Sequence, residues 1–187
     1  MRLTPIICEG KRIAEKYGVP ADAREICREE GILFLTYPMG KDSENCKGFI
    51  LKSNGKTAVT INSDLSERMQ QIVLFHELGH YFLHVKTGLM ECVHDASVYD
   101  RVSESELEAN MLAAQMQLSD DAVTEAFHES GDFFSAASLL GVPAELLEFK
   151  VRLMKHGGCS LPDPPLAGNS EYLAGYGAQM SGEESGS

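Results

Sequence analysis

The chain has 187 residues, 43% of them hydrophobic, which is the size of one ordinary domain with enough apolar side chains for a core. Its formal net charge of −12 disfavours an autonomous DNA-binding protein, because an acidic surface repels phosphate backbones. No signal-peptide core opens the chain, no apolar run approaches the roughly 20 residues of a membrane span, and five scattered cysteines without a C-x-x-C pair favour a reducing cytoplasm.

Two short helices and a small antiparallel sheet are predicted for the first part of the chain. Charge and apolar spacing favour a helix that stops at Gly18, and Pro20 suits the first turn of a second helix that runs to Gly31. Three strand-like segments follow, and Asn54-Gly55 between the last two is a strong hairpin signal. The predicted segments are helices at 9–17 and 20–31 and strands at 32–37, 48–52 and 56–62.

Helices dominate the second part of the chain. The first of them is apolar nearly all round, as is typical of a buried central helix, and a polar connection at 85–102 separates it from the next. The predicted helices are 66–84, 103–118, 120–139 and 143–156. The remainder is rich in Gly, Pro and Ser, lacks periodicity and ends in acidic residues, so we expect one domain at 1–157 and a flexible tail at 158–187.

The segment His76-Glu77-Leu78-Gly79-His80 on the central helix has the pattern of a zinc peptidase site. Residues four apart in an α-helix lie on one face, so His76 and His80 can present imidazole nitrogens to a single metal ion. Glu77 lies beside them, where its carboxylate can take a proton from a metal-activated water. Zinc suits such a site, because it accepts imidazole and carboxylate ligands and keeps a position for water. We therefore expect one zinc ion, with Glu77 as the catalytic residue.

Two buried histidines without a metal would be an alternative interpretation. It is disfavoured because the two side chains fall on a core-facing stripe, where burying them without partners costs free energy. His84, one turn further along, is too far to join the same ion without a break in the helix. We expect it in the core or in a supporting position.

A third ligand is expected from the helix at 103–118, where Glu106 and Glu108 are the candidates. Side chains two residues apart diverge by about 200° on a helix, so only one of them can face the histidines. Glu106 is favoured, because it shares a face with the small residue Ala109 and with Asn110, which could orient a ligand through a hydrogen bond. Both glutamates also stand at capping-box spacing from a serine, so helix capping is the alternative role for either.

With these motifs, the chain resembles the ImmA/IrrE family of metallo-endopeptidases. The resemblance extends from the first helices to about Lys155, and its most specific segments are 60–62, 76–84 and 106–114. The Glu-x-x-Ala-Asn pattern that begins at Glu106 corresponds to the glutamate ligand expected in the family. One departure is Met116-Gln-Leu-Ser-Asp120, where family members commonly continue into Leu-Leu-Met-Pro. It falls outside the expected ligands.

The resemblance implies an α+β, zincin-like fold in which the helix with the histidines packs on the helix with the glutamate. It also implies a protein substrate, usually a helix-turn-helix repressor of a mobile element or stress regulon, and this role rests on analogy. Two alternatives stay open: a metal-bearing regulator that binds a repressor without cleaving it, and a helix-turn-helix DNA-binding protein suggested by residues 137–147. The second is disfavoured by its acidic recognition helix, so direct nucleic-acid and membrane partners are not expected.

Overall fold

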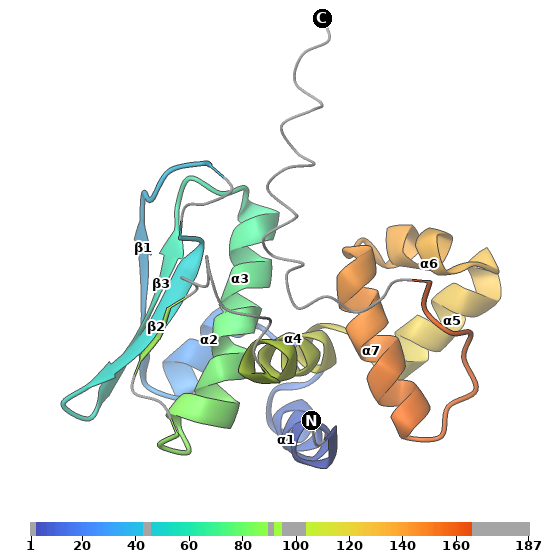
Figure 1. The fold of residues 1–187 in the computed structure, drawn as a ribbon, viewed down its shortest axis with the longest axis horizontal. Helices are drawn as coiled ribbons and strands as arrows, with labels where there is room; N and C mark the ends of the chain where they lie inside the picture. The colour runs from blue at the N-terminus through green and yellow to red at the C-terminus, as the bar shows by residue number, and fades with distance from the viewer. Residues whose placement is uncertain (1–2, 43–45, 90–91, 95–103, 166–187) are drawn as a thin grey trace, which may run out of the picture.

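Figure 1 shows the fold in a computed structural model, which describes residues 3–42, 46–89, 92–94 and 104–165. A small sheet and a set of helices make up the fold, so the predicted α+β class is confirmed. Within these residues the elements, in chain order, are α1 (Leu3–Tyr17), α2 (Ala23–Glu29), β1 (Ile32–Tyr37), β2 (Gly48–Ser53), β3 (Lys56–Asn62), α3 (Glu67–His80), the π-helix η1 (Tyr81–Val85), β4 (Cys92–His94), α4 (Glu104–Gln117), α5 (Asp120–Ser130), α6 (Phe133–Leu140) and α7 (Ala144–His156). None of these helices is long and apolar enough to cross a membrane.

The sheet has the strand order β1-β3-β2-β4 and is mixed. β2 runs antiparallel to β3 and to β4, as predicted for the hairpin, but β1 runs parallel to β3, so the prediction of a wholly antiparallel sheet is wrong for that strand. The hairpin turn forms where predicted, with positive φ angles of 50° at Asn54 and 76° at Gly55 that suit a tight hairpin turn. β1 pairs with the far strand of this hairpin, and no local pattern in the sequence encodes that choice.

The inner face of the sheet packs against α3 through the fully buried side chains of Ile50, Val59 and Ile61. A Cβ on Gly48 would lie 2.7 Å from Cγ1 of Val73, so the missing side chain at this point of β2 lets the sheet approach α3 closely. In Figure 1 the sheet, α3 and α4 follow one another across the molecule. Helix α3 is therefore enclosed between a sheet and a helix, which explains why it is apolar on nearly all sides.

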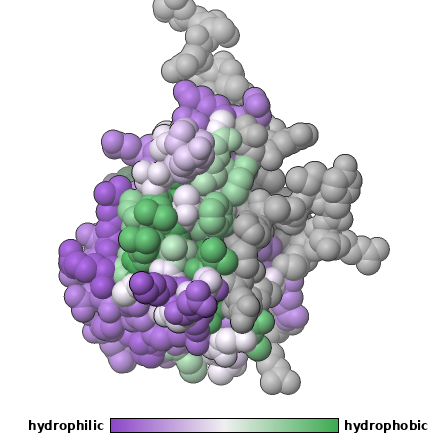
Figure 2. Space-filling view, turned by 90° about the vertical axis from the view of Figure 1, so that its left-hand side faces the viewer, coloured by the Kyte–Doolittle hydropathy of each residue, from purple (hydrophilic) through white to green (hydrophobic). Residues whose placement is uncertain are grey.

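The outer face of the sheet is exposed and apolar. Leu33, Leu35 and Tyr37 alternate along β1 and are 59%, 43% and 64% exposed, and Leu51 of β2 is 40% exposed. Figure 2 looks onto this side of the molecule and shows hydrophobic surface gathered there. The sheet thus has one face in the core and one apolar face in solvent.

Helices α5, α6 and α7 form a second apolar cluster beside α4. The single helix predicted at 120–139 is two helices, because Gly131 with φ 75° ends α5 and the side chain of Asp132 accepts a hydrogen bond from the backbone N–H of Ser135 to cap α6. The buried members of the cluster are Leu118, Val123, Ala126, Phe133, Ala136, Ala137, Leu147, Val151 and Met154.

Several predicted boundaries differ from the structure. α1 begins at Leu3 rather than at Glu9, and α2 begins after Asp22, whose side chain accepts hydrogen bonds from two backbone N–H groups, rather than at Pro20. The helices predicted at 103–118 and 143–156 agree with α4 and α7 within a residue.

Two predicted segments lie only partly among the described residues. The connection predicted as irregular at 85–102 is described at 85–89 and at 92–94, where it forms β4, and the rest of it lies outside. Of the predicted tail, residues 166–187 lie outside the described residues, whereas Leu161 packs against the second apolar cluster and Asp163 pairs with Lys155. The first residues of the predicted tail therefore contact the helical body.

Candidate metal centre

Helix α3 carries His76, Glu77 and His80 into the core. It begins after Ser66, whose side-chain oxygen accepts a hydrogen bond from the backbone N–H of Met69 at 3.3 Å. The side chains of the three motif residues are nearly inaccessible, each residue being 1% exposed. Because burying ionisable groups costs free energy unless they are engaged, their place in the core indicates a site rather than an incidental cluster.

Gly79 allows α4 to lie directly against α3. A Cβ at this position would lie 2.5 Å from the backbone oxygen of Ala109 and 2.9 Å from its Cα, distances that real Cβ atoms essentially never show. The predicted small-residue face of α4 is thus matched by a glycine on α3. The sequence interpretation missed the part played by Gly79, although the residue stands inside the motif.

Glu106 of α4 reaches both imidazoles. Its Oε2 lies 3.1 Å from Nε2 of His76 and its Oε1 lies 3.2 Å from Nε2 of His80, while the two Nε2 atoms are 3.0 Å apart. The ligand atoms of the three residues lie within 4.8 Å of one another. Zinc bonds of about 2.0–2.1 Å in a tetrahedral set keep neighbouring ligand atoms about 3.4 Å apart, so the three donors have nearly the size of one face of such a tetrahedron.

The charges of these three residues suit a divalent cation. Burial lowers the pKa of His80 to about 4, although its hydrogen bond with Glu106 acts in the opposite direction, so the imidazole is neutral near pH 7. Burial alone raises the pKa of Glu106, but hydrogen bonds with His76 and His80 outweigh it and hold the pKa below its ordinary value. Neutral imidazole and ionised carboxylate are the states in which these side chains bind metals.

Asn110 lies behind His76. Its Oδ1 is 2.6 Å from Nδ1 of His76, and the residue is fully buried. A carbonyl oxygen can only accept, so Nδ1 of His76 carries the proton and Nε2 is left with a lone pair on the side of Glu106. The structure thus places Asn110, which the sequence suggested as a residue that orients a ligand, in contact with His76.

Glu108 lies on another side of α4, as the two-residue spacing predicts. Its Oε2 is 3.1 Å from Nε2 of His84 in η1, and Nδ1 of His84 is 3.2 Å from Nδ1 of His80. His84 is 4% exposed. The sequence interpretation expected His84 in the core or in a supporting position but did not join it to Glu108. The signal was a second glutamate two residues after Glu106 and a histidine four residues after His80.

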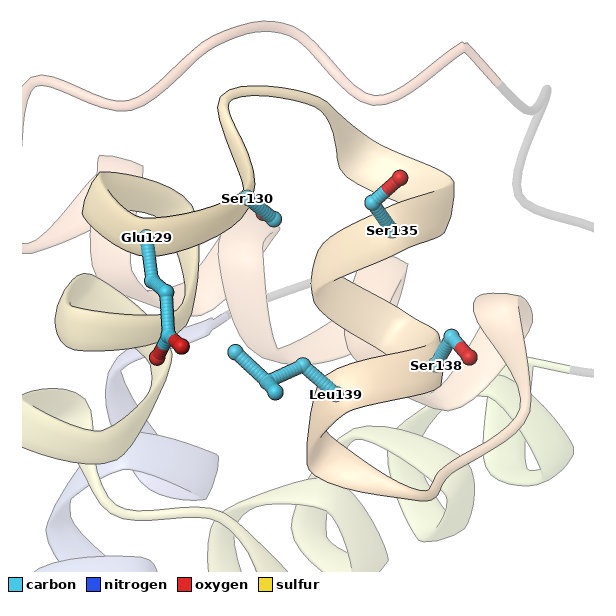
Figure 3. Close-up of a pocket in the computed structure, with 5 residues that line it drawn as sticks. All are labelled: Glu129, Ser130, Ser135, Ser138 and Leu139. Carbon is cyan, nitrogen blue, oxygen red and sulfur yellow. The ribbon is translucent and has the colours of Figure 1, made fainter.

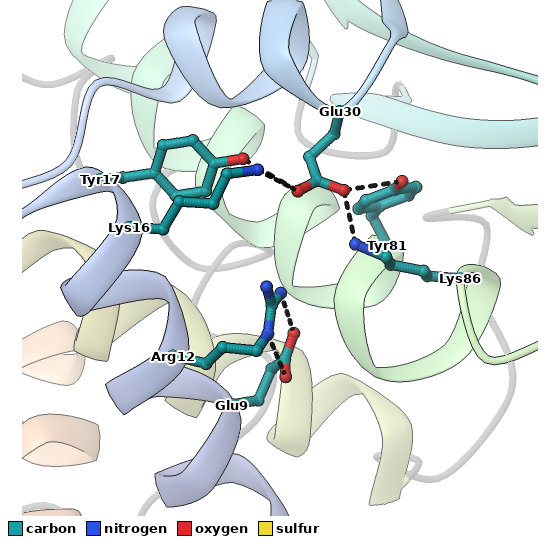
Figure 4. A network of polar contacts seen from close by, with 7 residues as sticks. All are labelled: Glu9, Arg12, Lys16, Tyr17, Glu30, Tyr81 and Lys86. Carbon is teal, nitrogen blue, oxygen red and sulfur yellow. Dashed lines mark hydrogen bonds and ion pairs between the residues drawn. The ribbon is translucent and has the colours of Figure 1, made fainter.

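A further polar cluster holds η1 against α1 and the end of α2 (Figure 4). The carboxylate of Glu30 accepts hydrogen bonds from Tyr17 Oη at 2.9 Å, Lys16 Nζ at 3.1 Å, Tyr81 Oη at 3.3 Å and Lys86 Nζ at 2.5 Å. Burial alone raises the pKa of Glu30, but the hydrogen bonds from Lys86, Tyr17 and Lys16 outweigh it and lower the pKa to about 2. No sequence motif marked this cluster, because its members come from three separate segments.

An open pocket between α5 and α6 is separate from the cluster of His76, His80 and Glu106 (Figure 3). Its lining residues are Glu129, Ser130, Ser135, Ser138 and Leu139. The lining holds one acid and three hydroxyls but no histidine or second acid that could activate them. Among the described residues, the group that could hold a metal ion therefore lies on α3 and α4 and not at this pocket.

Comparison with known proteins gives concordant results. The family model of the IrrE N-terminal-like domain, a peptidase family, matches residues 27–152. The chain is 28% identical over 131 residues to Metallopeptidase ImmA of Bacillus subtilis (strain 168), covering 68% of this chain and 73% of that protein. It is 30% identical over 103 residues to the uncharacterized immunity region protein 2 of Bacillus phage phi105, covering 55% of this chain and 64% of that protein. No solved structure matches.

Proposed function

The chain belongs to the ImmA/IrrE family of metallopeptidases, and on this premise we propose that it is a zinc-dependent endopeptidase whose ligands are His76, His80 and Glu106 and whose general base is Glu77. The single observation that carries the proposal is the convergence of two buried imidazole nitrogens and one carboxylate from two helices within 4.8 Å. Two imidazoles and one carboxylate form a ligand set typical of catalytic zinc sites, in which a fourth position is kept for water.

The residues around the cluster fit such an ion. Asn110 leaves the lone pair of His76 Nε2 available, burial keeps His80 neutral, and Glu106 supplies one negative charge. A bound zinc ion would lower the pKa of a coordinated water and polarise the carbonyl of the scissile peptide. These properties account for burying polar groups that would otherwise weaken the core.

Glu77 supplies the proton transfers. It directly follows His76 on α3 and is buried with it, so the residue stands beside the proposed ligands in the chain and in the core. In the proposed reaction Glu77 takes a proton from the water that attacks the carbonyl carbon and gives it to the nitrogen of the departing amine. Such a base contributes about 10²–10⁴-fold to the rate of a hydrolase.

The substrate we propose is a helix-turn-helix transcriptional repressor. Support comes from the family, whose members the sequence resembles, and from the phage relative, which is named as an immunity region protein. A cytoplasmic location suits such a substrate and agrees with Cys8, Cys27 and Cys159, which form no disulfide within the described part of the chain.

A DNA-binding function has less support. The helix that would enter the major groove is α7, and eight of its thirteen residues are buried against neighbouring helices. A recognition helix needs a free face for base contacts. The alternative metal-bearing regulator would bind a repressor without cleaving it, whereas the proposed peptidase would cleave it. One experiment on the bound repressor therefore separates the two.

The test uses the purified chain and a helix-turn-helix repressor, and any such repressor encoded beside its gene is the first candidate. The proposal expects cleavage into two fragments, loss of cleavage with a chelator, and recovery with one equivalent of Zn²⁺. Mass spectrometry of the fragments identifies the bond, and an internal bond establishes an endopeptidase. Stable complex formation without any fragment, in the presence of Zn²⁺, would support the non-catalytic regulator and overturn the peptidase proposal.

A further inference from the structure

His84 and Glu108 have no role in the proposed reaction, yet they extend the cluster behind His80. His84 is almost fully buried, and the side chain of Glu108 is 25% exposed. The contacts form a chain from Glu108 Oε2 to His84 Nε2 at 3.1 Å, and from His84 Nδ1 to His80 Nδ1 at 3.2 Å. The other nitrogen of His80 faces Glu106 at 3.2 Å.

Counting protons along this chain fixes each tautomer. An ionised carboxylate can only accept, so Nε2 of His84 carries a proton and donates it to Glu108. A neutral His84 then has a lone pair at Nδ1, which accepts from Nδ1–H of His80. With its proton at Nδ1, His80 has a lone pair at Nε2, the atom that faces Glu106.

We propose that Glu108 and His84 are positioning residues that fix the tautomer and ring orientation of His80, so that its Nε2 lone pair points to the metal position. The inference rests on the proposed metal site. It gives the two glutamates of α4 different tasks, with Glu106 as the ligand of the ion and Glu108 as the end of a supporting chain. A carboxylate at the end of such a chain also increases the basicity of the ligand.

The two ligand histidines are therefore supported in different ways. His76 donates from Nδ1 to a neutral amide, Asn110, whereas His80 donates through a second imidazole to a carboxylate. The geometry of η1 makes this possible, because the backbone N–H of Lys86 donates to the carbonyl of Tyr81, five residues back, and the helix is locally wider than an α-helix.

The first test measures the affinity for Zn²⁺ by competition with a chromophoric chelator, in the parent and in Glu108→Ala, His84→Ala and the double variant. Loss of such supporting groups typically weakens metal binding by about 10- to 100-fold, and we expect this for each single variant. Because both residues act through one chain, the double variant should be no weaker than His84→Ala. The matched control is Glu104→Ala, which removes the same charge from the exposed first turn of α4 and should bind like the parent.

The second test reads the tautomer itself in the metal-free protein, by correlation NMR of the histidine ring nitrogens at a pH where the rings are neutral. In the parent, His80 should be protonated at Nδ1, and in Glu108→Ala it should become a mixture with the Nε2-protonated form. Glu108→Ala changes a partly exposed side chain, so it carries the test even if His84→Ala fails to fold.

The outcomes separate this inference from the proposed function. Unchanged Zn²⁺ affinity and an unchanged His80 tautomer in Glu108→Ala, with the parent still binding Zn²⁺, would overturn the positioning role and leave the metal site intact. A parent chain that binds no Zn²⁺ would overturn the proposed function itself. If Glu108→Ala and Glu104→Ala lost the same affinity for Zn²⁺, the loss would come from the change in net charge alone. This result would overturn the inference as well.

Discussion

The side chains of α4 show how a spacing of two residues separates two glutamates. Glu106 turns toward His76 and His80, and Glu108 turns toward His84 one turn further along the partner helix. Both contacts are close to 3 Å, so neither carboxylate is a mere surface group. Substitution of single residues should therefore give distinct effects even within one helical turn.

The proposed catalytic role of Glu77 leads to the first prediction. Glu77→Gln keeps the size of the side chain and leaves the three proposed ligands in place, so the variant should bind Zn²⁺ like the parent and lose cleavage by about 10²-fold or more. Metal analysis of the dialysed protein and a time course of repressor cleavage measure the two properties. Cleavage at the parental rate would show that another group is the base.

The proposed third ligand, Glu106, leads to the second prediction. Glu106→Ala removes a carboxylate that lies 3.1 Å from His76 and 3.2 Å from His80, so it should lose Zn²⁺ on dialysis and lose activity. Glu108→Ala should retain more metal, because its carboxylate contacts only His84 among the clustered histidines described above. A reversed order, with Glu108→Ala metal-free and Glu106→Ala loaded, would refute the assignment of the ligand.

Much of the site at this scale follows from the sequence. The i, i+4 spacing of the histidines and the divergence of Glu106 and Glu108 come from helical periodicity, which is a local property, and the small residue Ala109 on the face of Glu106 led to the choice between them. The contact between His84 and Glu108 does not, because it depends on how far two helices separated by a long connection are shifted along each other. The cluster around Glu30 could not be predicted from the sequence for the same reason.

At the scale of secondary structure, the contact between α3 and α4 assembles the site. Gly79 and Ala109 meet with their backbones almost touching, and Glu106 lies one turn before Ala109 on α4. The position of the carboxylate therefore depends on the separation of the two helices.

The third prediction concerns this separation. In Gly79→Ala the added methyl group would clash with backbone atoms that cannot shift independently, so stability should fall by about 1–3 kcal/mol and Zn²⁺ affinity should fall with it. Gly10→Ala is the matched control, since its Cβ would meet only the side chain of Gln115, at 3.2 Å. That variant should keep its metal affinity and lose less stability than Gly79→Ala, because this contact is longer than the 2.5 Å contact at Gly79 and alanine favours the helix. Equal behaviour of the two variants would contradict the role of the close contact.

The fourth prediction concerns the Glu30 cluster, which joins α1, α2 and η1. The pKa of Glu30 is lowered from 4.5 to about 2, so its contribution to stability is complete above about pH 5 and is lost as the pH falls toward 2. Glu30→Gln should cost about 1.5–3 kcal/mol at neutral pH, the range for hydrogen bonds to charged groups, and the difference from the parent should shrink in acid. Urea unfolding at neutral pH and near pH 3 measures this. Exposed Glu29→Gln is the control, and a Glu30→Gln penalty that does not change with pH would contradict the assignment.

At the scale of the whole molecule, the fold consists of a sheet with α3 and α4 on one side and a second helical cluster around α7. The order of the elements, the hairpin and the class of the fold follow from the sequence, because they depend on local periodicity and turn residues. The parallel pairing of β1 and the break at Gly131 do not. The first depends on a connection between distant strands, and the second was hidden by apolar spacing that continues through the glycine.

The fifth prediction concerns the end of the chain. Truncation after Pro165 should leave the melting temperature and metal content unchanged, because the removed residues lack the apolar periodicity of a core segment. Truncation after Gly158 additionally removes Leu161, which packs against the second apolar cluster, and should lower the melting temperature slightly. A large loss of stability on truncation after Pro165 would show that the removed residues belong to the folded body.

Because of the π-helix at Tyr81–Val85, the site depends on the number of residues in this segment as well as on their identity. A π-helical turn is commonly an α-helix that has gained one residue, and one residue corresponds to about 100° of rotation. Deleting one residue here would preserve every proposed ligand and the motif itself, yet it would turn His84 away from Glu108. In an alignment of relatives, a single gap after the second motif histidine would therefore mark proteins that support that ligand by some other means.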